Sequence, residues 1–197
     1  MSKEIEISQE AGNNSEQYSS VGSMHINKPV LNLHNTSVRD KYSEYLQLVE
    51  EFEKEVNEGN TSLIGFIEKI QHYTSNIDTE VIGLHEKLRR AGYEKQYKRV
   101  NYLKEKYSKL YSENELSLAT QKIHAHILAK IWTLFLTYVN PAIDEGYSKT
   151  QISAIMNEQV IKPVEEIITQ KNVLNLDSSD IVGMIYFLTG NCHINWD

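Results

Sequence analysis

Apolar side chains recur at three- and four-residue intervals from Ser37 onward, which is the spacing of one buried face of an α-helix. The first such face contains Tyr42, Tyr45, Leu46, Val49, Phe52 and Val56. Further helices are predicted from Thr61 or Ser62, from Asp78 or Thr79, over 93–112, from Asn114 or Ser117 to Val139, from Ser148 or Thr150 to Ile168, and after Asp177. Because no stretch alternates apolar and polar residues as strands do, we expect an all-α fold, a single bundle of about six to eight helices.

Prolines and one glycine predict where helices end or approach closely. Pro141 is expected to end the long helix, because proline has no N–H to donate, and Pro163 to kink or restart the next one. Gly183 lies inside the last helix, where glycine costs about 1 kcal/mol relative to alanine. That cost indicates close packing against another helix.

The last helix has expected caps at both ends. Asp177 is a candidate N-cap, and Asp180 can reach back to it as in a capping box. Gly190 or Asn191 is expected to take the left-handed conformation that ends the helix.

Trp196 lies one residue from the end of the chain, where residues fray unless they are held. We expect its ring to dock between the helix that carries His126, Leu134 and Phe135 and the kinked helix around Pro163. The alternative is an exposed Trp196 that anchors a partner protein, since tryptophan is enriched among binding hot spots.

Residues 1–36 are rich in Ser, Asn, Glu and Gly and contain almost no aromatic side chains. This composition predicts a disordered tail, followed by a helical domain over residues 37–197. The short apolar run at 29–34 within the tail is either a docking segment or a loop that packs on the domain.

Composition narrows the classes of function. The net charge of −7 argues against non-specific nucleic-acid binding by the whole surface, and a single cysteine favours a reducing compartment. Residues 1–10 lack the regions of a secretion signal. The most apolar window, 123–143, contains His124, His126 and Lys130, so it is read as a buried helix rather than a membrane span. We expect a cytoplasmic protein.

Few residues are candidates for chemistry. His124 and His126 are two positions apart on a predicted helix, so they point roughly 200° apart and cannot share one ion. Cys192 and His193 are adjacent, which is poor spacing for zinc ligands and for a nucleophile with its base. No Gly-rich phosphate loop, Gly-x-Ser-x-Gly or His-Glu-x-x-His occurs. We therefore expect no catalytic residue, no metal and no cofactor, with Cys192 and His193 as the candidates if the protein is a small enzyme.

A basic segment runs from His85 to Tyr111, with nine lysines and arginines against three glutamates, a net charge of +6. The rest of the chain therefore carries −13, since the whole carries −7. Five tyrosines alternate with these cations: Tyr93, Tyr97, Tyr102, Tyr107 and Tyr111. Such a segment can bind phosphates and stack bases, but tyrosines at helical spacing also pack inward from a solvated face. Docking on an acidic protein surface is a third interpretation, which we rank above nucleic-acid binding.

Four runs resemble a known family: KIHAHILAK from Lys122, NPAIDEG from Asn140, VIKPV from Val160 and GMIYFLTGNCHINW from Gly183. Over about residues 80–197 the chain resembles the helical C-terminal domains of ABC three-component systems. These are bacterial conflict systems in which an SMC-like ABC ATPase works with a middle component and an effector. In that family the helical domain usually follows an effector enzyme, whereas here only the predicted tail and two predicted helices precede it.

The resemblance implies a non-catalytic adaptor that couples an SMC-like ATPase to an effector in anti-phage defence. The residues expected to contact partners are Lys95, Lys98, Arg99, His193 and Trp196. The alternatives are a nucleic-acid-binding helical protein that uses the basic segment, directly or through the complex, and the small enzyme described above.

Overall fold

The computed structural model describes residues 38–58, 68–75, 82–113 and 117–196, and every regular element in these ranges is helical. The prediction of an all-α fold is therefore confirmed. The α-helices are α1 (Val38–Glu58), α2 (Glu68–Thr74), α3 (Leu84–Arg90), α4 (Tyr97–Glu113), α5 (Leu118–Leu134), α6 (Asn140–Asp144), α7 (Lys149–Ile155), α8 (Lys162–Ile168) and α9 (Ser178–Gly190). The predicted tail 1–36 and the first turns of the second and third predicted helices lie outside the described residues.

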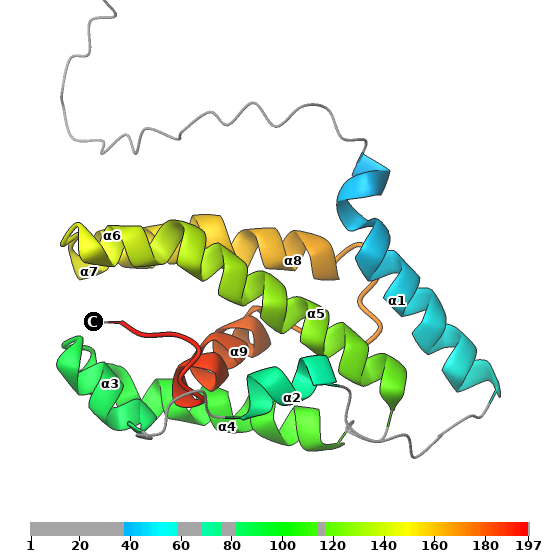
Figure 1. The fold of residues 1–197 in the computed structure, drawn as a ribbon, viewed down its shortest axis with the longest axis horizontal. Coiled ribbons are helices and arrows are strands. Elements are labelled where there is room, and N and C mark those ends of the chain that lie inside the picture. Colours follow the sequence, from blue (N-terminus) through cyan, green and yellow to red (C-terminus); the bar gives the residue numbers. More distant parts are fainter. Residues whose placement is uncertain (1–37, 59–67, 76–81, 114–116, 197) are drawn as a thin grey trace, which may run out of the picture. The chain divides into compact units, whose positions relative to one another are not determined.

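Three short elements connect some of these helices. A single 3-10 turn, η1 (Glu94–Gln96), precedes α4, so the helix predicted over 93–112 begins with this tighter turn. Two π-helical segments, η2 (Phe135–Val139) and η3 (Met156–Ile161), join α5 to α6 and α7 to α8. Together, α5 to α8 form two long helices that pack side by side as a hairpin, visible in the upper part of Figure 1.

Pro141 does not end the long helix, contrary to the prediction. The helix continues as α6, with Pro141 in its first turn directly after the π-helical segment η2. Pro163 has the same position in α8, directly after η3. A proline in a regular helix clashes with the carbonyl four residues earlier, and the wider turn of a π-helix changes that register. Both prolines are accommodated in this way within continuous helices.

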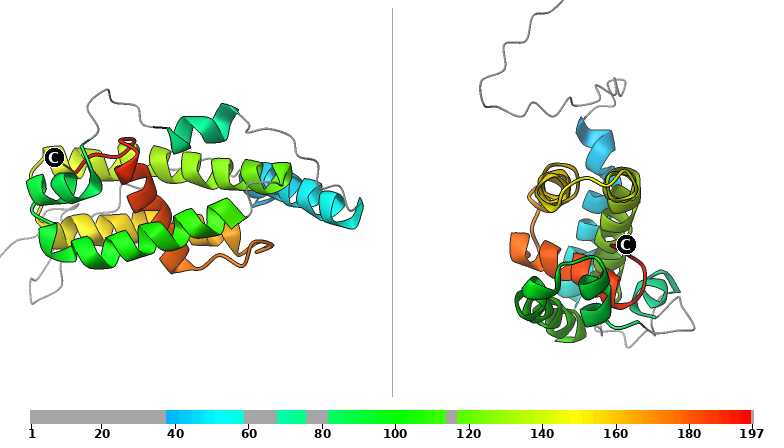
Figure 2. Two further views of the ribbon diagram at one scale, coloured as in Figure 1. Left: turned by 90° about the horizontal axis from the view of Figure 1, so that it is seen from below. Right: turned by 90° about the vertical axis from the view of Figure 1, so that its left-hand side faces the viewer.

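Helix α9 lies between α4 and the hairpin, as Figures 1 and 2 show, and its most extensive contact is with α4. Gly183 is buried in this contact. A Cβ atom at that position would lie 2.5 Å from the backbone oxygen of Leu103 and 3.0 Å from the Cβ of Tyr107. The predicted close approach at Gly183 is therefore confirmed, because no other residue fits there without moving α4.

The core is continuous from α1 to the C-terminal segment. Helices α1 and α2 both pack on α5. The largest fully buried side chains include Tyr45, Ile70, Leu88, Tyr107, Ile127, Phe135 and Met184. Side chains from α1 to the C-terminal segment thus share one apolar core.

Candidate functional site

The cations of the basic segment fall into two groups. Six of them have partners within the domain. Arg89 and Arg90 pair with Glu86, Lys104 with Glu105, Lys109 with Glu113, Lys106 with Asp177 and Asp180, and buried Lys87 donates to the Thr189 carbonyl. Those contacts serve the fold rather than a partner.

Lys95, Lys98 and Arg99 form the second group. All three are exposed, and none has an ion pair or side-chain hydrogen bond within the described ranges. Lys95 lies in η1 and the other two in the first turn of α4, so the three charges lie within about 6 Å along the helix axis. The sequence analysis named these same three cations as residues expected to contact a partner. In the structure they form a basic patch without internal partners in the described ranges, called the basic patch below.

Most tyrosines of the basic segment pack inward. Tyr93, Tyr107 and Tyr111 are buried in the core and Tyr97 is half-buried, whereas Tyr102 is 68% exposed. The three- and four-residue spacing of these tyrosines therefore reflects the apolar face of α4 more than a surface on which bases could stack. In the described part of this segment, Tyr102 is the one tyrosine with an exposed ring.

Trp196 is buried, with 7% of its surface exposed. Its ring contacts Phe135 and Tyr93 edge-on, with centroids 5.2 and 5.5 Å apart, and stacks on Tyr186 at 5.8 Å. The indole N–H donates to Thr189 Oγ1 over 3.1 Å. Of the elements expected to receive the ring, Phe135 in η2 does contact it. Beyond the end of α9, the C-terminal segment runs toward α3 (Figure 1).

Cys192, not Gly190 or Asn191, takes the left-handed conformation after α9, with φ of +65°. Its N–H bonds the Thr189 carbonyl, and the N–H of His193 bonds the Leu188 carbonyl over 2.9 Å, the pair that defines a Schellman motif. The prediction of the terminating residue was wrong because glycine and asparagine are only statistical preferences there. The turn buries Cys192, and no hydrogen bond joins its sulfur to a histidine ring among the described residues.

His193 connects the end of α9 to two other helices. Its Nε2 lies 3.1 Å from the Ser75 carbonyl after α2, and its own carbonyl accepts from Trp132 Nε1 of α5 over 3.0 Å. Its ring packs edge-on against His72, with centroids 5.1 Å apart. Burial lowers the pKa of His193, so the neutral ring is favoured. These contacts give His193 a structural role, whatever it adds to partner binding.

His124 and His126, the other two histidines considered for chemistry, contact different parts of the fold. His124 is buried against Tyr107, with Nδ1 3.3 Å from the phenol oxygen, and burial lowers its pKa to about 4. His126 lies 3.6 Å from Glu44 of α1. Within the described ranges, no three histidine, cysteine or carboxylate side chains come close enough to hold a metal ion.

A pocket of about 280 Å³ opens beside Trp196. Its lining comes from four parts of the fold: η1 with the residue before it, the helix α7 with η3, α9 and the C-terminal segment. It includes Tyr93, Gln96, Ile152, Met156, Tyr186 and Trp196. Sequence reasoning singled out Trp196 and Tyr93 but missed Gln96, Met156 and Tyr186, because single residues on three different helices leave no local pattern.

Residues 83–196 match a family described as C-terminal domain 9 of the ABC-three component (ABC-3C) systems. This range covers more than half of the chain, and the chain belongs to that family. The match confirms the resemblance drawn from the sequence, and it includes α3 to α9, the basic patch and the pocket. No curated protein and no solved structure matches the chain. In the described ranges, no helix combines the length and the apolar character needed to cross a bilayer.

Proposed function

We propose that this chain is a non-catalytic helical adaptor of an ABC-3C system, which couples an SMC-like ATPase to an effector in cytoplasmic anti-phage defence. Family membership supports a role as a component of such a system. The observation that carries the adaptor role is the free basic patch of Lys95, Lys98 and Arg99, because the domain uses its neighbouring cations internally. A charged patch left unpaired by the fold is suited to steer and orient a partner of opposite charge.

The buried turn at Cys192 supports an adaptor over an enzyme. A reactive cysteine needs an accessible sulfur near a positive charge or a base. Cys192 instead supplies the left-handed residue of a buried turn, and the ring of its neighbour His193 reaches the Ser75 carbonyl. This geometry assigns both residues to the end of α9.

The inward tyrosines favour a protein partner over nucleic acid. Single-stranded binding usually combines a basic groove with a series of exposed aromatic rings. Tyr93, Tyr107 and Tyr111 are unavailable for stacking, so the patch offers charge without the rings. Any nucleic acid is then bound through the assembled complex rather than by this patch alone.

Co-purification tests this function. The tagged chain is expressed with the ATPase and the other components of its system, and the complex is measured by size-exclusion chromatography with light scattering. We expect a stable complex with at least one component, and we expect Cys192→Ser to retain both complex formation and protection against phage. Absence of any complex would contradict the adaptor role, and loss of protection by a folded, complex-forming Cys192→Ser protein would support an enzyme.

A further inference from the structure

We propose that the Trp196 pocket and the basic patch form one docking site, which receives an acidic segment of a partner protein that inserts a large apolar side chain. This inference rests on the proposed adaptor function and names the site that performs it. The partner is a component of the same system, and the segment that binds here carries several aspartates or glutamates around one apolar anchor.

The pocket and the patch are adjacent. Gln96 lines the pocket and lies directly after Lys95 in η1. Burial raises the pKa of Tyr186, another lining residue, to about 12, and the charge of Arg99 is close enough to oppose that shift. One extended segment can therefore place an apolar side chain in the pocket and carboxylates over the patch.

The charges around the pocket favour an acidic occupant. Lys149, at the start of α7, lies with its ammonium 5.1 Å from the Tyr93 ring centroid. Of the glutamates next to the lining residues in sequence, Glu94 lies 3.7 Å from His85 and Glu158 pairs with Lys162. Four cations, Lys95, Lys98, Arg99 and Lys149, therefore outnumber these two carboxylates, although Lys149 also donates to the Gly92 carbonyl. This balance of charge favours an occupant that carries carboxylates.

The size and lining of the pocket favour a side chain over a metabolite. Its volume of about 280 Å³ lies just below the range of about 300–1,000 Å³ that is usual for small-molecule sites. Aromatic walls from Tyr93, Tyr186 and Trp196 are typical of the pockets that hold hot-spot residues at interfaces. Part of the wall, including Met156 and Asn157, is the π-helical segment η3, and π-helical turns are frequent at functional sites.

Tyr93 provides a specific polar group for the occupant. Its side chain is 7% exposed, and its hydroxyl has no hydrogen-bond partner in the described part of the chain. A buried hydroxyl without a partner is unfavourable in the free protein. The hydroxyl is closed to solvent in the free protein, so the inserted segment must shift the Tyr93 side chain to bond it, and the new bond then recovers that free energy on binding.

The first experiment identifies the occupant by photo-crosslinking. The photoreactive amino acid p-benzoylphenylalanine replaces Ser153, an exposed residue of the pocket lining, in the full chain co-expressed with its system. The control carries the same amino acid at exposed Tyr102. We expect the Ser153 probe alone to capture a component of the system, through a peptide that is acidic and contains a large apolar residue. Capture of residues 1–36 of the same chain, of a second copy, or of nucleic acid would overturn the proposal.

The second experiment measures the affinity of the captured component for variants that keep the core intact. Ser153→Trp fills the pocket and the triple variant K95E/K98E/R99E reverses the patch, and each should weaken binding at least about tenfold. Ser112→Trp on α4 and the triple variant K54E/K109E/K130E, which makes the same charge change on other exposed lysines, should bind as the wild type does.

The third variant, Tyr93→Phe, should weaken binding severalfold while leaving the melting temperature unchanged or higher. A complex that forms normally with all three pocket and patch variants would overturn the docking site but leave the adaptor function standing. Failure to form any complex, even in the wild type, would contradict the adaptor function itself.

Discussion

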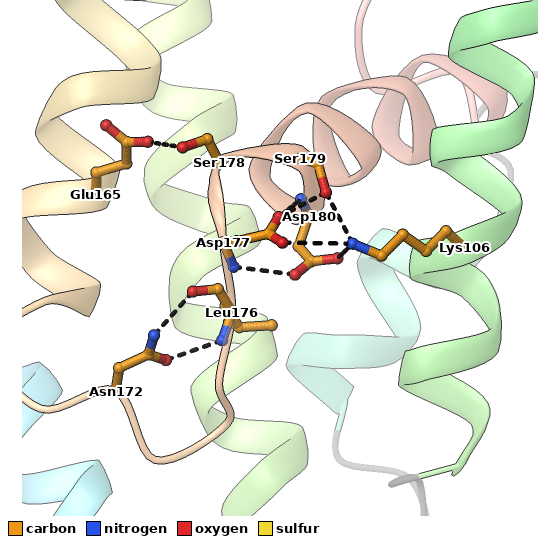
Figure 3. Close-up of polar contacts among 8 residues, drawn as sticks. All are labelled: Lys106, Glu165, Asn172, Leu176, Asp177, Ser178, Ser179 and Asp180. Carbon is orange, nitrogen blue, oxygen red and sulfur yellow. Dashed lines mark hydrogen bonds and ion pairs between the residues drawn. The ribbon is translucent and has the colours of Figure 1, made fainter.

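The N-terminal end of α9 is held by polar contacts that are mostly exposed or half-buried, with Asp180 as the one buried carboxylate among them, whereas its C-terminal end is held by buried groups from several other helices. At the N-terminal end, Asp177 and Asp180 form the predicted capping box, with each side chain accepting from the other's backbone N–H over 3.0 and 2.9 Å. Lys106 of α4 lies 2.8 Å from Asp180, and Glu165 of α8 accepts from Ser178. Figure 3 shows that these contacts surround the first turn of the helix.

At the C-terminal end, the Thr189 carbonyl accepts from the ammonium of Lys87, a residue that is 4% exposed. A positive charge at this position also interacts favourably with the helix dipole. His193 and Trp196 add contacts to α2, α5 and η2 within the next few residues.

The difference lies in burial. Polar contacts that water can replace contribute little each, whereas a buried aromatic ring removes a large apolar area from water. We therefore expect the packing of α9 to depend far more on the contacts at its C-terminal end, although that end has no regular structure beyond Gly190.

Trp196→Ala is expected to have the largest effect. Truncating a buried tryptophan typically costs about 3–5 kcal/mol, against a total stability of about 5–15 kcal/mol for a domain. We expect the urea midpoint to fall sharply, or the protein to lose its cooperative transition. Tyr102→Ala, at a ring that is 68% exposed, serves as the control and should unfold as the wild type does. A midpoint for Trp196→Ala close to that of the wild type would show that the C-terminal segment does not hold the fold.

Gly183→Ala tests the contact between α9 and α4 midway between the two ends. The new methyl group would meet backbone at 2.5 Å, so the helices must separate, and overpacking of this kind costs about 1–3 kcal/mol. Gly83→Ser is the control, because a Cβ at Gly83 meets nothing within 4 Å and serine is a better N-cap for α3. Equal thermal stability of the Gly183→Ala protein and the wild type would contradict the close packing.

Acidification should first act through two buried histidines, His193 at the C-terminal end of α9 and His124 of α5, which packs on Tyr107. Burial lowers the pKa of His193 and lowers that of His124 to about 4, so the unfolded chain binds more protons than the folded one below about pH 6.5. The free energy of unfolding should therefore fall as pH drops from 7 toward 4, by at most about 1.4 kcal/mol per pH unit for each histidine. The double variant His124→Gln/His193→Gln should have a flatter profile.

The N-terminal end should respond at lower pH. The hydrogen bond from Ser179 holds the pKa of Asp177 below its usual range, so its contribution is present above about pH 4 and is lost as pH falls further. Urea titrations between pH 7 and 3 separate the two windows. A profile of the histidine double variant that matches the wild type would contradict this assignment.

Asp177→Ala is expected to have the smallest effect. Loss of an N-cap side chain typically costs about 1 kcal/mol, and the ion pair that Asp177 itself forms with Lys106 is exposed. Asp177→Ser retains the cap and should unfold nearly as the wild type does. A loss for Asp177→Ala as large as that for Trp196→Ala would reverse the comparison between the two ends.

The sequence predicted the contacts that depend on neighbouring residues. The capping box at Asp177, the start of a helix at Ser148, one of two predicted starts, and the close approach at Gly183 each follow from a few adjacent positions, and the structure confirms them. The end of the helix at Pro141 was predicted wrongly, because the π-helical segment that accommodates the proline depends on packing between two helices.

The candidate site was predicted only in its separate parts. Lys95, Lys98 and Arg99 were identified by charge and Trp196 by its place near the end of the chain. The nine cations of the basic segment differ in whether they have a partner within the domain. That partner can be up to 102 residues away in the sequence, as Thr189 is for Lys87. The pocket depends on three helices and the C-terminal segment meeting in space, which no local pattern encodes.

We propose that the fold uses the C-terminal end of α9 internally and leaves the basic patch free for a partner. The affinity of the K95E/K98E/R99E protein for the captured component, measured on samples whose urea transition has been recorded, tests both parts at once. We expect an unchanged transition with binding weakened at least about tenfold, while K54E/K109E/K130E binds normally. Normal binding by the patch variant, or a collapse of its stability, would show that the patch is not a free surface for the partner.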